Sequence, residues 1–157
     1  MRLDRKLTEL APWVLHCPAF ESPTDIQSFR LHFSPLAGMP TMDYSCSVTV
    51  SRHALPGTPI TIDRVLRSIH RALHTPLEPA ALPQSDPLRT HVEEAFCRRT
   101  GRTFDAQTDV LRNVDLHMVG RSQGSGLYFN GIAVEDVQGA YGPYPVFHVL
   151  LKDYVQG

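Results

Sequence analysis

The sequence predicts an α+β domain, in which a mainly antiparallel sheet of about five strands carries two principal helices on one face. Two observations support this prediction. Residues 60–74 and 85–101 place apolar side chains at helical spacing. Several other segments alternate apolar and polar side chains, as half-buried strands do, and the elements follow one another in the order ββααβββ.

The segment 60–74 is the clearest helix of the sequence. Its apolar stripe has the spacing of one helical face and consists of Ile62, Val65, Leu66, Ile69 and Leu73. Thr61 is a suitable N-cap, and Thr75-Pro76 ends the helix because proline disfavours the helical conformation in the residue before it. These features predict an amphipathic helix that packs on the sheet.

A second helix is predicted from Ser85, its N-cap, to Gly101, its C-cap, with Pro87 in the first turn. Its buried stripe is expected to contain Leu88, Val92, Ala95, Phe96 and Cys97. Residues 1–12 are expected to form a short N-terminal helix or arm, which Pro12 ends.

Alternation predicts five strands. Those over 26–34 and 44–52 are expected to form a hairpin with a long loop. The others are predicted over 112–119, 127–132 and 145–154, and the last is nearly all apolar, which indicates a central position in the sheet.

Length and composition limit the classes of function. The chain of 157 residues suits a single domain, 1–157. Its net charge of −1, from 15 basic and 16 acidic residues, argues against nucleic-acid or membrane-surface partners. The three cysteines include no C-x-x-C pair, which favours reduced thiols in the cytoplasm. The N-terminus does not resemble a secretory signal, and no apolar stretch approaches the ~20 residues of a membrane span.

The polar side of the predicted sheet offers a candidate acid–base site. On the predicted strand 112–119, Asp115 and His117 are two residues apart and would point to the same side, together with His32 of the first strand. A carboxylate beside an imidazole orients the ring and raises its pKa, which suits a cofactor-independent lyase, isomerase or hydrolase. Other side chains expected on this open face are Arg30, Ser47, Thr49, Asn113 and His148.

Two loops offer a candidate binding surface instead. Tyr141 and Tyr144 stand among glycines and prolines in 139–145, where they present rigid aromatic surface. The glycine-rich segment 120–126 lacks the lysine of a phosphate-binding loop and is expected to be a hairpin loop. Because no catalytic signature is present, the first hypothesis is a binding or protein-interaction domain. Its unidentified protein or small-molecule ligand would contact Tyr141, Tyr144 and Tyr128.

A metal site is the third hypothesis. His70 and His74 are spaced i, i+4 on the first helix and can share one divalent ion, with Asp63 as a further ligand. The glutamate of an H-E-x-x-H motif is absent, and Arg67 beside the pair disfavours a cation. A solvated helix flank is therefore favoured, and no cofactor is expected.

Three short motifs occur in the order Val65-Leu66-x-x-Ile69, Arg112-x-x-Asp115-Leu116 and Phe129-x-Gly131-Ile132. This order resembles a domain family of unknown function that is abundant in mushroom-forming fungi. In that family the three motifs lie on a helix, a strand and a further strand. The resemblance covers roughly residues 10–155 and implies a fungal, cytosolic protein, but it transfers no catalytic residue. The family often has a glycine pair after the aspartate, where this chain has Leu116-His117-Met118.

Overall fold

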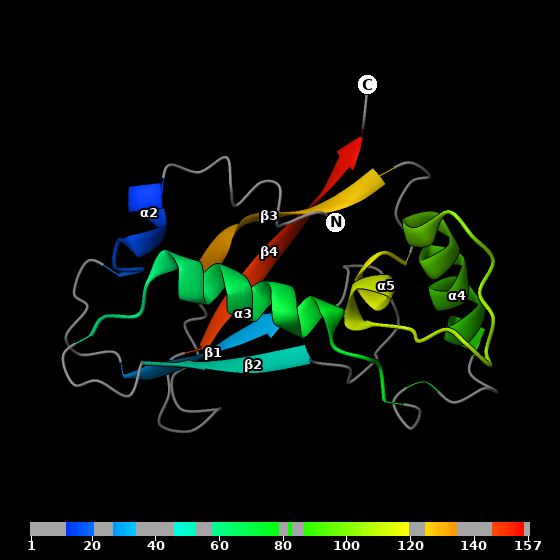
Figure 1. The fold of residues 1–157 in the computed structure, drawn as a ribbon, viewed down its shortest axis with the longest axis horizontal. Helices are drawn as coiled ribbons and strands as arrows, with labels where there is room; N and C mark the ends of the chain where they lie inside the picture. The colour runs from blue at the N-terminus through cyan, green and yellow to red at the C-terminus, as the bar shows by residue number, and fades with distance from the viewer. Residues whose placement is uncertain are drawn as a thin grey trace.

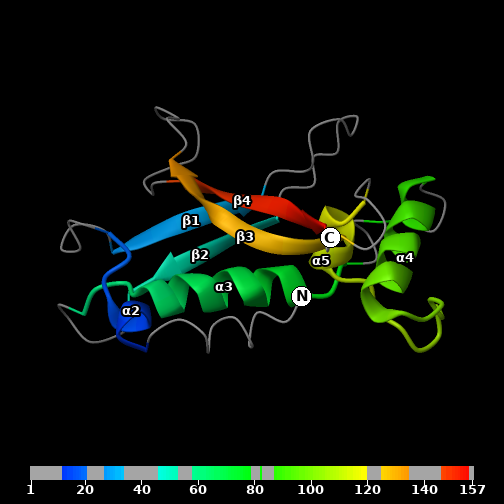
Figure 2. The same ribbon diagram turned by 90° about the horizontal axis from the view of Figure 1, so that it is seen from above.

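The computed structural model describes residues 12–20, 27–33, 46–52, 58–78, 82, 87–119, 125–134 and 146–155. Four strands form one mixed sheet with the order β2-β1-β4-β3. The strands are β1 (Ser28–Phe33), β2 (Cys46–Ser51), β3 (Ser125–Val134) and β4 (Val146–Val155). The helix α3 runs across one face of this sheet (Figures 1 and 2).

The pairing of the strands differs from the prediction at the centre of the sheet. β1 pairs antiparallel with β2, as the predicted hairpin requires, and β3 pairs antiparallel with β4. The central pair of β1 and β4 is parallel, so the sheet is mixed. The prediction of about five mainly antiparallel strands was therefore wrong in number and in one pairing, whereas the central position of the last strand is confirmed.

The helix α3 (Ile62–His74) confirms the predicted amphipathic helix. Thr61 is its N-cap, and the side-chain oxygen of this residue accepts a hydrogen bond from the Arg64 backbone N at 3.3 Å. The buried residues of α3 are Val65, Leu66, Ile69, Ala72 and Leu73. Four of them, Val65, Ile69, Ala72 and Leu73, belong with residues of β1 to one hydrophobic core between α3 and the sheet; the β1 residues are Phe29, Leu31 and Phe33.

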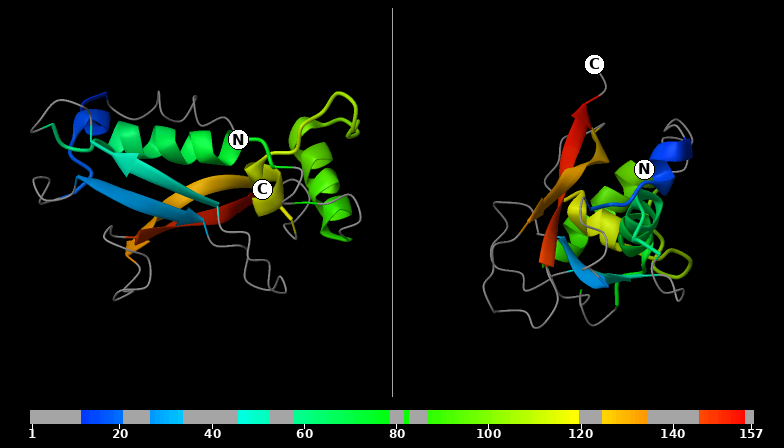
Figure 3. Two further views of the ribbon diagram at one scale, coloured as in Figure 1. Left: turned by 90° about the horizontal axis from the view of Figure 1, so that it is seen from below. Right: turned by 90° about the vertical axis from the view of Figure 1, so that its left-hand side faces the viewer.

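The helix α4 (Pro87–Thr100) begins with Pro87 in its first turn, as predicted, while Ser85 lies outside the described residues. Gly101 follows the helix with φ of 75°, a conformation that glycine adopts without strain, and its N–H donates to the Cys97 carbonyl at 2.8 Å. Val92, Ala95 and Phe96 are buried. However, α4 lies beyond one end of the sheet and packs on α5 (Asn113–His117), so it does not share a sheet face with α3 (Figures 1 and 3).

The N-terminal region contains a short helix that was not predicted. Pro12 begins this helix, α2 (Pro12–His16), because the first turn of a helix tolerates the missing N–H of proline. The predicted arm before it lies outside the described residues. After α2, the Cys17 carbonyl accepts a hydrogen bond from the Ile62 N–H at 3.1 Å, which fixes α2 beside the start of α3. No helix in the described part of the chain has the length and apolar character to cross a membrane.

Candidate functional site

The segment predicted as the third strand is a helix, and this changes the candidate acid–base site. Asn113–His117 forms α5, in which Asp115 stands in the first turn. The carboxylate of Asp115 accepts a hydrogen bond from the Arg112 backbone N at 2.9 Å and so caps the start of the helix. Apolar and polar residues alternate over this segment, and the alternation resembled that of a half-buried strand. In the helix, however, polar residues also occupy buried positions, so the alternation does not separate a buried side from an exposed side.

A buried ion pair determines the environment of Asp115. The Arg99 guanidinium of α4 donates from Nε to Oδ1 of Asp115 at 2.6 Å and from Nη2 to Oδ2 at 3.0 Å. The side chain of Asp115 is 0% exposed and that of Arg99 is 16% exposed. This bidentate pair, together with the Arg112 N–H, occupies both oxygens of the carboxylate and joins α4 to α5.

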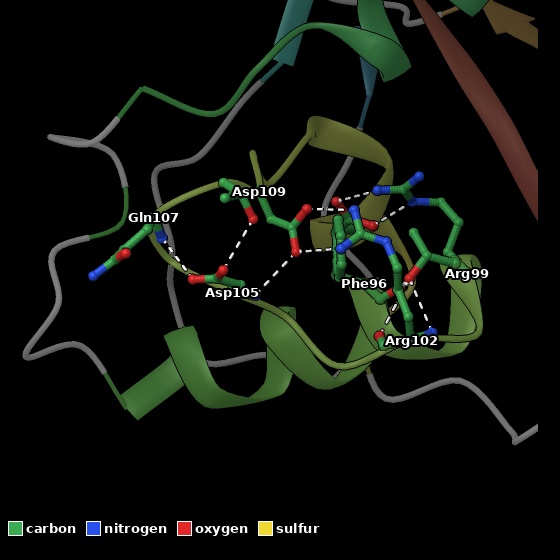
Figure 4. Close-up of polar contacts among 9 residues, drawn as sticks. Phe96, Arg99, Arg102, Asp105, Gln107 and Asp109 are labelled. Atoms are coloured by element: carbon green, nitrogen blue, oxygen red, sulfur yellow. Dashed lines mark hydrogen bonds and ion pairs between the residues drawn. The ribbon is translucent and has the colours of Figure 1, made fainter.

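The Arg99 side chain also packs against an aromatic ring at the end of α4. The guanidinium carbons of Arg99 and Arg102 lie 5.1 and 5.3 Å from the centre of the Phe96 ring. Phe104 meets the same ring edge-on, with 5.2 Å between the ring centres. Both arginines therefore stack on one buried aromatic side chain (Figure 4).

Arg102 forms a second, more exposed ion pair that closes the loop after α4. Its Nη1 donates to Oδ2 of Asp109 at 2.7 Å, and its Nη2 bonds the other oxygen. Asp109 also accepts from the Asp105 backbone N at 2.9 Å, while Asp105 accepts from Gln107 N at 2.9 Å (Figure 4). The hydrogen bonds from Arg102 and from the Asp105 backbone lower the pKa of Asp109, and Asp109 raises that of Arg102.

The predicted triad of Asp115, His117 and His32 does not lie on one sheet face. Asp115 and His117 belong to α5, and His117 is buried with its ring centre 5.8 Å from that of Phe33. Phe33 faces the core, whereas His32 points to the opposite side of β1. Asn113, which was also expected on the open face, is buried in α5.

The outer face of the sheet, opposite α3, gathers a different set of polar residues. Register places His32 of β1 beside His148 of β4, and their ring centres are 5.2 Å apart. Arg30 lies two residues before His32 on the same face, and its neighbour on β2 is Thr49. None of the described side chains on this face is a carboxylate. In the described part of the structure, no helix lies over this face (Figures 2 and 3).

The predicted metal pair on α3 is engaged in other contacts. The rings of His70 and His74 stack with 4.1 Å between their centres, and Nδ1 of His74 lies 2.9 Å from the His70 carbonyl oxygen. Both oxygens of Asp63 accept from Arg67 Nε at 2.8 Å. Among the described residues, no group of three or more histidine, cysteine or carboxylate side chains is arranged to hold a metal ion.

The predicted aromatic contacts involve side chains outside the described part of the structure. Tyr141 and Tyr144 lie outside the described residues, as do residues 120–124 of the glycine-rich segment. Tyr128 belongs to β3, where its backbone is opposite Lys152, but its side chain is outside the described part. The ligand contacts of these tyrosines therefore stay a prediction.

Two residues with a structural role were missed by the sequence analysis. Arg99, in the last turn of α4, is the partner of Asp115. Asn113 donates from Nδ2 to the Ala72 carbonyl at 2.8 Å and so caps the end of α3 from 41 residues away. An arginine and an aspartate that are 16 residues apart give no local signal of contact, so sequence spacing alone did not reveal either role.

The three short motifs have structural explanations. Val65, Leu66 and Ile69 are buried in the core. The segment Arg112–Leu116 is the N-cap and the first turn of α5, not a strand. In β3 the pairing register shifts between Phe129 and Gly131, which indicates a bulge at this point of the edge strand.

Comparison with known proteins identifies a family but no function. A family model described as "Family of unknown function (DUF6699)" matches residues 2–138. No curated protein matches the chain, and no solved structure matches it. Because the family model covers most of the 157 residues, the chain belongs to the DUF6699 family of unknown function.

Proposed function

We propose that this protein is a binding domain, and that the outer face of its sheet receives a ligand carrying a carboxylate or phosphate group. The observation that carries the proposal is the pair of His32 and His148, whose ring centres are 5.2 Å apart. Arg30 adds a permanent positive charge to the same face. Since the described side chains there include donors but no carboxylate, the face favours an anion over a cation.

The state of Asp115 supports binding over the predicted acid–base chemistry. A carboxylate that orients a catalytic imidazole accepts a hydrogen bond from that ring. The hydrogen bonds that Asp115 accepts from described residues come instead from Arg99 and from the Arg112 backbone. Asp115 therefore stabilises the junction of α4 and α5 in this proposal.

An NMR titration with inorganic phosphate at constant pH and ionic strength tests the proposal. We expect saturable shifts of the ring resonances of His32 and His148. We expect no saturable shift of His91, whose side chain is 61% exposed on α4, so this residue is the internal control. The variant His148→Gln should weaken the response of His32, while His91→Gln should leave it unchanged. Shifts that are equal for all histidines, or that do not saturate, would contradict the proposal.

A small cofactor-independent enzyme is the second candidate function. The same pair of imidazoles favours it, because one neutral ring can accept a proton while one protonated ring donates another. This candidate predicts turnover with a bell-shaped pH profile that disappears in both His32→Gln and His148→Gln. If phosphate esters and carboxylate esters bind to this face without being converted, the binding function stands alone.

A further inference from the structure

The strand β2 forms one edge of the sheet (Figure 1). Among the described residues only those of β1 pair with it, and its six residues pair without a register shift. Free strand edges can add further strands, so proteins commonly protect them with prolines, charged side chains or bulges. β2 contains no proline, glycine or charged residue, whereas the opposite edge strand β3 has a bulge between Phe129 and Gly131. The edge at β2 is therefore the one suited to strand addition.

The hydrogen bonds to β1 determine which backbone groups of β2 face the free edge. The Arg52 N–H donates to the Gln27 carbonyl at 2.9 Å, and these two residues continue the β1–β2 register as a hydrogen-bonded pair. Hydrogen-bonded and non-hydrogen-bonded pairs alternate along an antiparallel ladder. Every second residue of β2 therefore bonds to β1, and the residues between them direct their N–H and C=O groups to the free edge. These outward-facing residues are Ser47, Thr49 and Ser51.

The sequence of this edge is the same in both directions. The segment Ser47-Val48-Thr49-Val50-Ser51 reads identically from either end, with Thr49 at its centre. When two β2 strands pair antiparallel about a twofold axis at Thr49, each Thr49 lies opposite its own copy, and Ser47 lies opposite Ser51 of the second copy. All the outward-facing residues then fall in hydrogen-bonded pairs, each of which exchanges two backbone hydrogen bonds.

The side chains of β2 suit the same register. Thr49 and Ser51 are exposed, and small hydroxyl side chains that lie opposite one another stabilise paired strands. Val48 and Val50 point to the inner face, where both contact the hydrophobic core, and in this register each lies opposite the other valine of the second copy. Val48 is only half-buried in the single chain, so the pairing would cover more of its apolar surface.

We propose that a second copy of this chain pairs with the β2 edge, antiparallel about a twofold axis at Thr49, so that two four-stranded sheets join into one. Such an interface is isologous, because the same strand serves both copies. Directly opposite residues of an antiparallel pair point to the same side, so equivalent faces of the two copies stay together. The joined sheet carries both α3 helices on one side and both pairs of His32 and His148 on the other. The pairing of β2 does not require a ligand at these histidines.

Sedimentation equilibrium of the wild type and of three variants tests the proposal. At high concentration we expect the wild type to have about twice the 17.6 kDa mass of one chain. Thr49→Lys should raise the dissociation constant of the dimer at least about tenfold, because two ammonium groups would face each other across the axis. Thr49→Ser keeps a small hydroxyl side chain and should leave the dimer unchanged. Ile132→Lys, which alters an exposed apolar residue of the opposite edge strand, should also leave it unchanged.

Cysteine cross-linking tests the register of the two strands and does not depend on how the lysine variant folds. The α-carbons of a hydrogen-bonded antiparallel pair are about 5.5 Å apart, which suits a disulfide. Thr49→Cys should therefore form an intermolecular disulfide on oxidation. Ser51→Cys should not, because the two copies of residue 51 would be about 13 Å apart along the strands. Mass spectrometry of the linked peptides distinguishes this disulfide from bonds of the native cysteines.

Three results would overturn the proposal. The first is a wild type that stays monomeric up to its highest soluble concentration. The second is a dimer that Thr49→Lys does not weaken, or that Ile132→Lys weakens equally. The third is equal cross-linking of Thr49→Cys and Ser51→Cys, since that outcome would exclude a twofold axis at Thr49.

Discussion

Replacing Arg99 by glutamine tests whether the buried ion pair holds α4 and α5 together. The change removes two charge-assisted hydrogen bonds and leaves the carboxylate of Asp115, which is 0% exposed, bonded only to the Arg112 N–H. Removing one partner of a buried ion pair typically costs about 3–5 kcal/mol. Because Arg99 is 16% exposed and one hydrogen bond to Asp115 remains, we expect the lower end, about 3 kcal/mol.

Arg102→Gln is the matched control for this experiment. Arg102 also stacks on Phe96 and also pairs with an aspartate, Asp109, whose side chain is 4% exposed, but the Arg102 side chain is 58% exposed. The two variants therefore lose similar contacts and differ mainly in the exposure of the arginine. Because water can replace the exposed Arg102 guanidinium beside Asp109, Arg102→Gln should lower the free energy of unfolding less than Arg99→Gln. Urea unfolding followed by circular dichroism measures both, with similar denaturant slopes as the sign that the comparison is valid.

Two further variants separate the ion pair from simple loss of packing. Arg99→Lys keeps the charge without the bidentate geometry and should fall between the wild type and Arg99→Gln. The double variant Arg99→Gln/Asp115→Asn removes both charges, so it should be less destabilised than the sum of the two single variants. A loss in Arg99→Gln no larger than that in Arg102→Gln would refute this role of the ion pair.

Asn113→Ala should lower the free energy of unfolding by about 1–3 kcal/mol, because the Ala72 carbonyl at the end of α3 loses its buried donor; urea unfolding measures the loss. Ile69→Ala should cost about 2–5 kcal/mol in the same assay, since this side chain is 0% exposed at the centre of α3. The pKa of His74 is lowered from 6.5 in the folded protein, so the unfolded chain binds more protons at this residue as the pH falls below about 6.5. The contribution of His74 to the free energy of unfolding is therefore complete above about pH 6.5 and declines as the pH falls toward its folded-state pKa. His74→Gln should remove this part of the pH dependence. The lowered pKa of Asp109 acts in the same direction at lower pH, since its contribution to the free energy of unfolding is present above about pH 3.8 and is lost as the pH falls through its folded-state pKa. Asp109→Asn should therefore reduce the dependence of the thermal unfolding temperature on pH in the acid range.

The sequence predicted those parts of the fold that depend on local periodicity. The α3 stripe apart from Ile62, the β1–β2 hairpin and the central position of β4 all follow from the spacing of apolar residues, and the structure confirms them. Ile62 is half-buried. The parallel pairing of β1 with β4 has no local signal, because the two strands are separated by most of the chain. The mixed character of the sheet therefore could not be predicted from spacing.

The candidate site was predicted only in part, for a physical reason that α5 makes clear. A helix of five residues is too short to distinguish its periodicity from the alternation of a strand. Its stability depends on Asp115 as a cap and on Arg99 as a partner from another helix. By contrast, His32 and His148 were both expected on the open face of the sheet, and the structure brings their rings together.

The most direct test of the proposed function is the affinity for inorganic phosphate of the variant Arg30→Gln, read from the ring resonances of His32 and His148. If the outer face of the sheet binds anions, removal of the Arg30 charge should weaken phosphate binding at this histidine pair about tenfold. The response of His74 should not change, because this residue belongs to α3, which lies on the other side of the sheet from the histidine pair (Figure 2). Unchanged affinity at His32 and His148 in Arg30→Gln would contradict the proposal that this face is the ligand-binding surface.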